Sequence, residues 1–289
     1  MSGSSLPGNQ EAIEAWNTVL FDKFVRYRPF VTTALGLHGT RGIERLAPRP
    51  GASVVDIGCG FGDTTIQLAD RVGPTGRATG VDAASRFIDT ARAEAAGRSN
   101  VRFEVADVEA AVPGGPYDYA FSRMGTMFFA SPVFALRNIR KTLVPGGRFC
   151  MVVWRKKEAN DCFYYAEVAV REILGDPPKN DQVTCGPGPF SMASPDLVSD
   201  QMRAAGYTDI TFERSDGDVL VGKTISEAID FALMLGPAGE VVRLAGQAAI
   251  DRRDEVEAAL RKVIEPFVRP DGVYAPSSCW LVTATSPAS

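Results

Sequence analysis

The segment Ser53-Val-Val-Asp-Ile-Gly-Cys-Gly-Phe-Gly-Asp-Thr-Thr65 carries more information about the fold than any other part of the chain. A short apolar run leads into Asp56, and glycines then occupy every second position, Gly58, Gly60 and Gly62, ahead of helix-forming sequence. Because glycine has no Cβ, a strand, turn and helix of this kind lets the backbone approach a ligand closely. The segment therefore predicts a ligand-binding strand–turn–helix unit.

The glycine spacing separates two cofactor classes. A dinucleotide fingerprint needs its third glycine one position later, where this chain has Asp63, and has no need for a carboxylate just ahead of the first glycine. A phosphate-binding P-loop would require Gly-Lys-Ser/Thr, which this turn does not contain. The turn is therefore typical of neither class.

Strand and helix signals alternate around this turn. The predicted strands are 54–57, 77–82, 101–106, 117–122 and 148–154, and the predicted helices between them are 63–71, 84–96 and 131–143. This alternation indicates a doubly wound parallel sheet, because each helix returns the chain to start a strand in the same direction. Further strands at 208–213 and 278–285 give an α/β fold with a seven-stranded, mostly parallel sheet.

The composition limits the class of protein. The 289 residues can bury a substantial core, and a net charge of −4 argues against a protein built to hold nucleic acid. We expect no membrane span, because no apolar stretch approaches ~18 residues, and no signal peptide, because the N-terminus has no basic region followed by an apolar segment. The protein is therefore expected to be cytoplasmic. We expect reduced thiols and no metal site, because the chain has a single histidine and its cysteines are scattered: Cys59, Cys150, Cys162, Cys185 and Cys279.

Polar residues follow each of the first four predicted strands, at the edge where an open parallel sheet binds ligands. Asp82 suits two vicinal ribose hydroxyls, and Asp107 suits an adenine amino group, with the Val108 N–H directed to a ring nitrogen. A single acidic residue after a strand is often only a helix cap or turn former. Four such matches in sequence order favour one nucleoside-containing ligand.

Residues 50–154 resemble the SAM-binding half of the class I S-adenosyl-L-methionine (SAM)-dependent methyltransferases. The resemblance rests on motif I (Val54–Gly62), Gly80-Val-Asp82, Val105-Ala-Asp-Val108, Phe121-Ser-Arg-Met-Gly-Thr-Met-Phe-Phe129 and Leu143-Val-Pro-Gly-Gly-Arg148. The Ser-Arg-x-Gly-x-Met-Phe-Phe run and Val153-Trp-Arg155 are loosely similar to the bacterial ubiquinone/menaquinone C-methyltransferase group. SAM is the cofactor that this resemblance implies.

The resemblance also implies roles for individual residues. It places Asp82 and Ala83 at the ribose, and Asp107 and Val108 at the adenine. It places the motif I turn (Asp56, Gly58, Cys59 and Gly60) and Ser122 at the methionine part. The chain departs from enzymes that methylate amide or base nitrogens, from metal-dependent catechol methyltransferases and from arsenite methyltransferases, because the residues after strand 117–122 and the cysteines do not match theirs.

Two residues are candidates for catalysis. Methyl transfer from a sulfonium is an in-line displacement that depends mainly on alignment and exclusion of water. His38 is the first candidate base, with a helix-end hydrogen bond as the structural alternative. Arg123, at a strand tip, is expected to hold an acceptor carboxylate or enolate oxygen, to pair with a lid carboxylate, or to form a structural ion pair.

The rest of the chain suggests how an acceptor is enclosed. We expect a helical lid at 1–48, with one helix over 11–31 and a second over 33–46. The SAM-binding core is expected at 49–155 with its continuation at 196–223, and the last strand and tail at 271–289. Helical insertions are expected at 156–195, over the acceptor, and at 224–270. The predicted acceptor pocket is apolar, with Met124, Met127, Phe128, Phe129, Trp154, Phe163, Tyr164 and Phe190.

Together these features predict a SAM-dependent methyltransferase acting on a C, O or N centre of a small apolar or aromatic molecule. A homodimer is possible, and no nucleic-acid partner is expected. Two alternatives stay open: a protein of the same fold that binds SAM without transferring a methyl group, and an NAD(P)-dependent oxidoreductase. The intact glycine turn and Asp82 disfavour the first alternative, and the glycine spacing disfavours the second.

Overall fold

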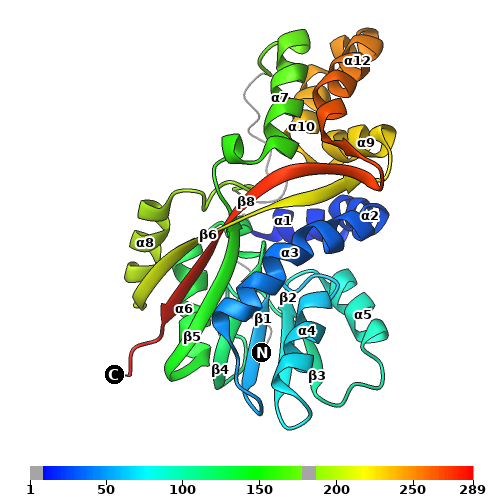
Figure 1. Ribbon diagram of the computed structural model, residues 1–289. Coiled ribbons are helices and arrows are strands. Elements are labelled where there is room, and N and C mark those ends of the chain that lie inside the picture. The colour runs from blue at the N-terminus through cyan, green and yellow to red at the C-terminus, as the bar shows by residue number, and fades with distance from the viewer. Residues whose placement is uncertain (1–8, 178–186, 289) are drawn as a thin grey trace.

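The computed structural model describes residues 9–177 and 187–288. Its strands form one sheet in the order β3-β2-β1-β4-β5-β8-β6, and β7 pairs with β8 outside this path (Figure 1). The strands are β1 (Ser53–Ile57), β2 (Arg77–Asp82), β3 (Val101–Val105), β4 (Tyr117–Arg123), β5 (Leu143–Trp154), β6 (Thr208–Gly222), β7 (Val268–Arg269) and β8 (Gly272–Thr285). β1 to β5 pair in parallel, and β8 is antiparallel to both β5 and β6. The predicted α/β sheet is confirmed, with the two-residue β7 as an addition.

Helices cover both faces of the sheet and bury its central strand. On one side α3 (Arg28–Leu46) contacts α4 (Asp63–Val72), and α5 (Ser85–Glu94) packs on β2 and β3. Elsewhere α6 (Pro132–Thr142) contacts α8 (Pro195–Ala204). Val54, Val55 and Ile57 of β1 are completely buried, which explains why this strand reads as a continuous apolar run. The strand order reverses between β1 and β4, the usual place for a ligand.

The N-terminal segment differs from its prediction. The sequence predicted a long helix over 11–31 and a second over 33–46, whereas the structure has α1 (Asn9–Asn17), α2 (Val19–Arg26) and α3. Tyr27 separates α2 from α3, and Pro29 lies in the first turn of α3, where its missing N–H removes no helical hydrogen bond. The first two helices lie between the sheet and an upper helical lobe (Figure 1).

β6 and β8 are much longer than predicted. They pair from Thr208 and Thr285 to Gly222 and Val273, and so extend beyond Trp154, where β5 ends, as a two-stranded ribbon. The sequence located only the part inside the sheet, because the ribbon starts with the polar and glycine residues 215–218 and its apolar run, 219–221, is only three residues long. The ribbon reaches the upper lobe of helices in Figure 1.

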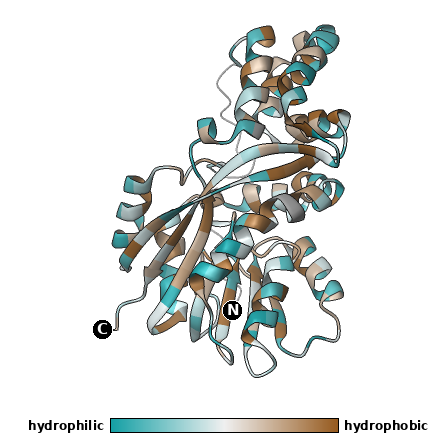
Figure 2. Cartoon of the chain, viewed as in Figure 1, coloured by the Kyte–Doolittle hydropathy of each residue, from teal (hydrophilic) through white to brown (hydrophobic). Residues whose placement is uncertain are grey.

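The upper lobe brings the two predicted insertions together, since α7 contacts both α10 and α12. Its helices are α7 (Asp161–Leu174), α9 (Ile225–Leu235), α10 (Pro237–Ala245), α11 (Gln247–Asp251) and α12 (Arg253–Ile264). Short 3-10 turns are Thr126–Phe128, Lys157–Ala159 and Glu265–Phe267. A second apolar cluster, including Val170, Val219 and Leu260, holds this lobe on the ribbon. In Figure 2 the helices of this lobe carry both hydrophobic and hydrophilic residues, and much of α12 is hydrophilic.

Candidate active site

A cavity of about 350 Å³ lies at the carboxyl ends of β1, β2 and β4, within the ~300–1,000 Å³ typical of small-molecule sites. Its walls come from α1 to α3, the glycine turn, the strand tips and the upper lobe. Seven predicted cofactor residues line it: Gly58, Cys59, Gly60, Asp82, Ala83, Asp107 and Val108. The topology therefore brings these residues, from three successive βα units, to one cavity wall.

The glycine turn is held tightly against the second strand. Gly58 and Gly60 have φ angles of +66° and +54°, which residues other than glycine rarely adopt. The N–H groups of Gly58 and Cys59 donate to the Val81 carbonyl at 2.8 and 3.1 Å. A Cβ on Gly58 would lie 3.0 Å from the Gly125 Cα, so any side chain there would push the turn away from β4. The turn thus presents backbone directly to the cavity.

Asp82 is fixed with its carboxylate at the cavity edge. Its Oδ2 accepts from the Gly60 N–H at 3.0 Å, and its Oδ1 accepts from the Ala84 N–H at 2.9 Å. Burial raises the pKa of this carboxyl, and these hydrogen bonds lower it. A carboxylate oxygen can accept more than one hydrogen bond, so Asp82 retains capacity for a ligand hydroxyl.

Asp107 connects the core to the first described helix. Its Oδ2 accepts from the Asn9 side-chain amide at 2.8 Å, and its Oδ1 accepts from the Glu109 N–H at 2.9 Å. Glu109 also lines the cavity, and its carboxylate accepts from the N–H groups of Ala130 and Ser131 before α6. Burial raises the pKa of the Glu109 carboxyl. The sequence analysis missed both Asn9 and Glu109.

Asp56 and Ser122 do not line the cavity, which argues against the direct cofactor contacts predicted for them. Asp56 is 1% exposed and accepts a 2.7 Å hydrogen bond from the Thr65 hydroxyl. Burial raises the pKa of Asp56 to about 7. The completely buried Ser122 hydroxyl donates to the Ile57 carbonyl at 2.8 Å. Both residues therefore hold the ends of β1, α4 and β4 together.

His38 lies outside the cavity wall, and its surroundings favour a structural role over the predicted role as a base. The ring is completely buried, with Nδ1 2.9 Å from the Ser215 hydroxyl and Nε2 2.8 Å from the Ser277 hydroxyl. Burial, with a smaller effect of Arg41, lowers its pKa to about 4. His38 thereby joins α3 to both strands of the ribbon, and its ring packs edge-on against Trp154 of the cavity wall.

Arg123 lines the cavity and forms an ion pair, which was one of the roles predicted for it, with a partner that the sequence did not identify. Its Nη2 lies 2.7 Å from Asp63 Oδ2, and the two side chains are 9% and 23% exposed. Asp63 begins α4, directly after the glycine turn, so the partner is in the core and not in the lid. A Cβ on Gly39 would lie 2.8 Å from the Arg123 Cδ, which shows how closely α3 covers the arginine.

Met124, the next residue, has strained backbone. Its φ is +59°, and this backbone conformation is unfavourable for any residue that has a Cβ. Its N–H donates to the Val152 carbonyl at 2.9 Å. Its side chain lines the cavity beside Arg123. Such strain persists only where the surrounding structure enforces it, and it is frequent at functional sites.

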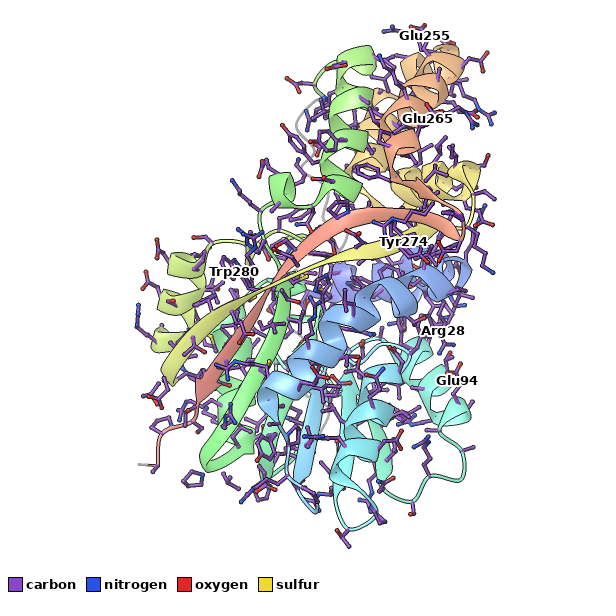
Figure 3. The ribbon with its side chains drawn as sticks, in the orientation of Figure 1. Arg28, Glu94, Glu255, Glu265, Tyr274 and Trp280 are labelled. Atoms are coloured by element: carbon purple, nitrogen blue, oxygen red, sulfur yellow. The ribbon has the colours of Figure 1, made fainter. Side chains whose placement is uncertain are left out.

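An aromatic cluster closes the cavity on the side of α1 and α2. The centre of the Trp16 ring lies 5.1 Å from the ring centre of Phe128, 5.3 Å from that of Phe24 and 6.3 Å from that of Phe87, and all three contacts are edge-on. The Arg28 side chain pairs with Glu94 of α5, next to it in Figure 3, and lies 4.3 Å from the centre of the Phe61 ring. This pair raises the pKa of Arg28 and lowers the pKa of Glu94. The N-terminal helices are thus fastened to the glycine turn.

The other end of the cavity is apolar. Of the predicted acceptor residues, all but Tyr164 line it. The ribbon adds Val219, and the upper lobe adds Phe231, Met234, Leu235 and Pro237. The sequence analysis did not identify these, because their approach to Trp154 depends on the path of the ribbon. Across the described ranges, no cluster of three or more His, Cys, Asp or Glu side chains has a geometry suited to a metal ion.

Comparison with known proteins agrees with this geometry. The family described as "Methyltransferase domain" matches residues 48–213, more than half of the chain. The chain belongs to the class I SAM-dependent methyltransferases. This methyltransferase uses SAM as its cofactor, and the seven cavity residues from three strand ends fit a nucleoside with a ribose diol and an adenine.

Two curated relatives and one solved structure illustrate the similarity. Nocamycin O-methyltransferase of Saccharothrix syringae is 28% identical over 65% of this chain and 72% of its own length. Demethylmenaquinone methyltransferase of Staphylococcus aureus is 31% identical over 37% of this chain. The methyltransferase spans less than half the length of this second relative, 45%. The YcgJ protein of Bacillus subtilis shares the fold, with a TM-score of 0.51 and 17% identity over 88% of this chain and 98% of its own.

The structure describes the side chains of three of the five cysteines. Cys59, Cys150 and Cys279 are buried, and burial raises the pKa of Cys59 and Cys150. Cys185 lies outside the described residues, as do parts 1–8 and 178–186 of the expected lid and insertion. No helix within the ranges that the structure describes is long and apolar enough to cross a membrane.

Proposed function

We propose that this methyltransferase transfers the methyl group of SAM to a small apolar or aromatic molecule bound in the same cavity. The observation that carries the proposal is the continuity of that cavity. It joins Asp82 and Asp107 at one end to Trp154, Phe163 and the upper lobe at the other. A polar cofactor end and an apolar second end suit two different small molecules held next to one another.

The proposed cofactor contacts follow the cavity wall. Asp82 would accept from the ribose hydroxyls, and Asp107 from the adenine amino group, with Val108 beside it. The backbone of Gly58 to Gly60 would face the methionine part. Asp56 and Ser122 would act by holding the turn, since their hydrogen bonds are made to Thr65 and Ile57.

When bound, SAM supplies an electrophilic methyl group on a sulfur that leaves readily. The chain contributes alignment and exclusion of water, worth up to ~7–11 kcal/mol in well-organised cases. The aromatic cluster around Trp16 excludes water on the cofactor side, and the upper lobe does so on the acceptor side. Arg123 and Asp63 form the charged pair at the junction between the two ends.

The relatives' names favour an enzyme over a binding protein of the same fold. One relative is named as an O-methyltransferase and the other as a demethylmenaquinone methyltransferase, so the names leave the methylated atom open. The proposal includes a small-molecule partner and a cytoplasmic location, without nucleic acid, and allows a homodimer. The net charge of −4 supports the absence of a nucleic-acid partner.

Calorimetric titration with S-adenosylhomocysteine, with NADH as the control ligand, tests the cofactor end. Micromolar binding of the first alone is expected, and binding of NADH alone would contradict the proposal. Trp154→Ala tests the acceptor end: it should leave S-adenosylhomocysteine affinity within about threefold and weaken apolar acceptors by about tenfold or more, since it removes ring contacts. Equal losses for both ligands would show that the cavity does not divide in this way.

A further inference from the structure

Arg123 is the one Lys or Arg among the described residues that line the cavity. Its guanidinium carries five N–H donors, and Asp63 takes a contact at Nη2. In the described part of the chain, Asp63 is the one carboxylate recorded within ion-pair distance of Arg123. The side chain lines the cavity, and its other N–H groups make no hydrogen bond to a described residue, so these donors are open to a ligand. A guanidinium in such a place requires acceptor oxygens, and its fork geometry matches a delocalised oxyanion.

The surroundings strengthen this preference. Met124, Met127 and Trp154 line the wall near Arg123, and an apolar wall lowers the local dielectric, so a charge-assisted hydrogen bond is stronger there than in water. Asp63 and the close cover of Gly39 restrict the arginine to one orientation. A protonated amine would be repelled by the guanidinium. A neutral alcohol would gain less from it than an anion does.

We propose that the methyl acceptor is an apolar molecule bearing a delocalised oxyanion, such as a carboxylate or the enolate of a 1,3-dicarbonyl, and that Arg123 binds this oxyanion. The inference rests on the proposed function and specifies its substrate class. A carboxylate acceptor is already ionised in neutral water before it binds, so the chain need not remove a proton from it.

The chemistry of the transfer balances without a base. The acceptor oxygen forms the new O–CH3 bond while the S–CH3 bond breaks, and the electron pair of that bond stays on sulfur. A positive sulfonium and a negative oxygen give two neutral products, and an apolar site favours such charge cancellation. Of the titratable residues in this part of the described cavity wall, Asp63 pairs with Arg123, and Glu109 accepts from the N–H groups of Ala130 and Ser131. His38 is enclosed by Ser215 and Ser277, outside the wall.

The test compares acceptors with one carbon skeleton on the S-adenosylhomocysteine complex. 2-Naphthylacetic acid, 2-(2-naphthyl)ethanol and 2-(2-naphthyl)ethylamine are titrated by calorimetry into wild type, Arg123→Gln and Arg123→Lys. The acid should bind at least about tenfold more tightly than the alcohol or the amine. Arg123→Gln should remove that advantage, and Arg123→Lys should keep part of it, because lysine retains the charge without the fork. Arg155→Gln is the matched control, because Arg155 is ion-paired and lies outside the cavity wall. This variant should still bind the acid more tightly than the alcohol or the amine.

Each outcome is informative. Three results overturn the proposal: the acid and the alcohol bind equally, the acid does not bind, or Arg123→Gln keeps the preference for the acid. An equal loss of S-adenosylhomocysteine affinity in Arg123→Gln also overturns it, because Arg123 would then bind the carboxylate of the cofactor. Thermal unfolding of each variant distinguishes these results from misfolding. If wild type does not bind S-adenosylhomocysteine, the proposed function itself is refuted. If wild type binds S-adenosylhomocysteine but does not prefer the acid, only the proposed acceptor class is refuted.

Discussion

The side-chain amide of Asn9 donates a 2.8 Å hydrogen bond to the carboxylate of Asp107. The contact joins α1 to the strand tip that we propose as the adenine site. An Asn amide and an adenine amino group are both NH2 donors, so they suit the same acceptor oxygen. The lid and the cofactor therefore share an acceptor.

Asn9→Ala should increase affinity for S-adenosylhomocysteine, because the cofactor no longer displaces the amide from Asp107. One net hydrogen bond contributes about 0.5–1.5 kcal/mol, so the dissociation constant should fall by roughly twofold to tenfold. Calorimetry measures this directly. Asn17→Ala, at the other end of α1, is the control, since the Asn17 side chain contacts α5 and not Asp107. A weaker complex in Asn9→Ala would mean that the amide binds alongside the adenine.

Asp82→Ala should weaken S-adenosylhomocysteine binding by more than about tenfold, because it removes a charged acceptor for the ribose. The fold should persist, although Gly60 and Ala84 lose their acceptor. Asp70→Ala is a suitable control, because Asp70 pairs with Arg98 on the surface. Unchanged affinity in Asp82→Ala, with a normal circular dichroism spectrum, would refute the proposed role.

Arg28→Ala should loosen the N-terminal helices, since it removes both the pair with Glu94 and the contact with the Phe61 ring. Cation–π contacts contribute about 0.5–2 kcal/mol. We expect faster proteolysis within residues 9–27 and a severalfold weaker cofactor complex. Arg26→Ala is the neighbouring control, because Arg26 is exposed and lies 3.9 Å from Asp230. Equal proteolysis rates for the two variants would argue against a fastened lid.

His38 and Asp56 should affect the pH dependence of the free energy of unfolding in opposite directions. The folded-state pKa of His38, about 4, is below its usual 6.5, so its contribution is complete above pH 6.5 and is lost as the pH falls toward 4. The folded-state pKa of Asp56, about 7, is above its usual 3.8, so its contribution is complete below 3.8 and is lost as the pH rises toward 7. The two slopes oppose one another between about pH 4 and 6.5.

Urea unfolding of His38→Gln and Asp56→Asn between pH 4.5 and 6.5 separates these contributions. Relative to wild type, the free energy of unfolding of His38→Gln should decrease with rising pH, by up to ~1.4 kcal/mol per unit. That of Asp56→Asn should increase with rising pH over the same window. Parallel curves for a variant and wild type would show that the replaced group does not titrate there.

Much of the core could be predicted from the sequence. The predicted strands 54–57 and 77–82 differ from β1 and β2 by at most one residue, because a buried parallel strand is a continuous apolar run. The ribbon was not predicted, since its strands lie beyond the end of β5, pair with each other and with the two-residue β7, and carry polar residues such as Ser215 and Asp216. The break at Tyr27 was missed because apolar spacing continues across it.

The sequence by itself determined the sheet, the glycine turn and the placement of Asp82 and Asp107 at its edge, because these depend on neighbours a few residues apart. Only the tertiary structure decided which groups face the cavity. His38 is enclosed by Ser215 and Ser277, 177 and 239 residues away along the chain. Arg123 is oriented by Asp63, and Asn9 reaches Asp107 across 98 residues. Such contacts depend on how distant segments pack, and local spacing does not encode that.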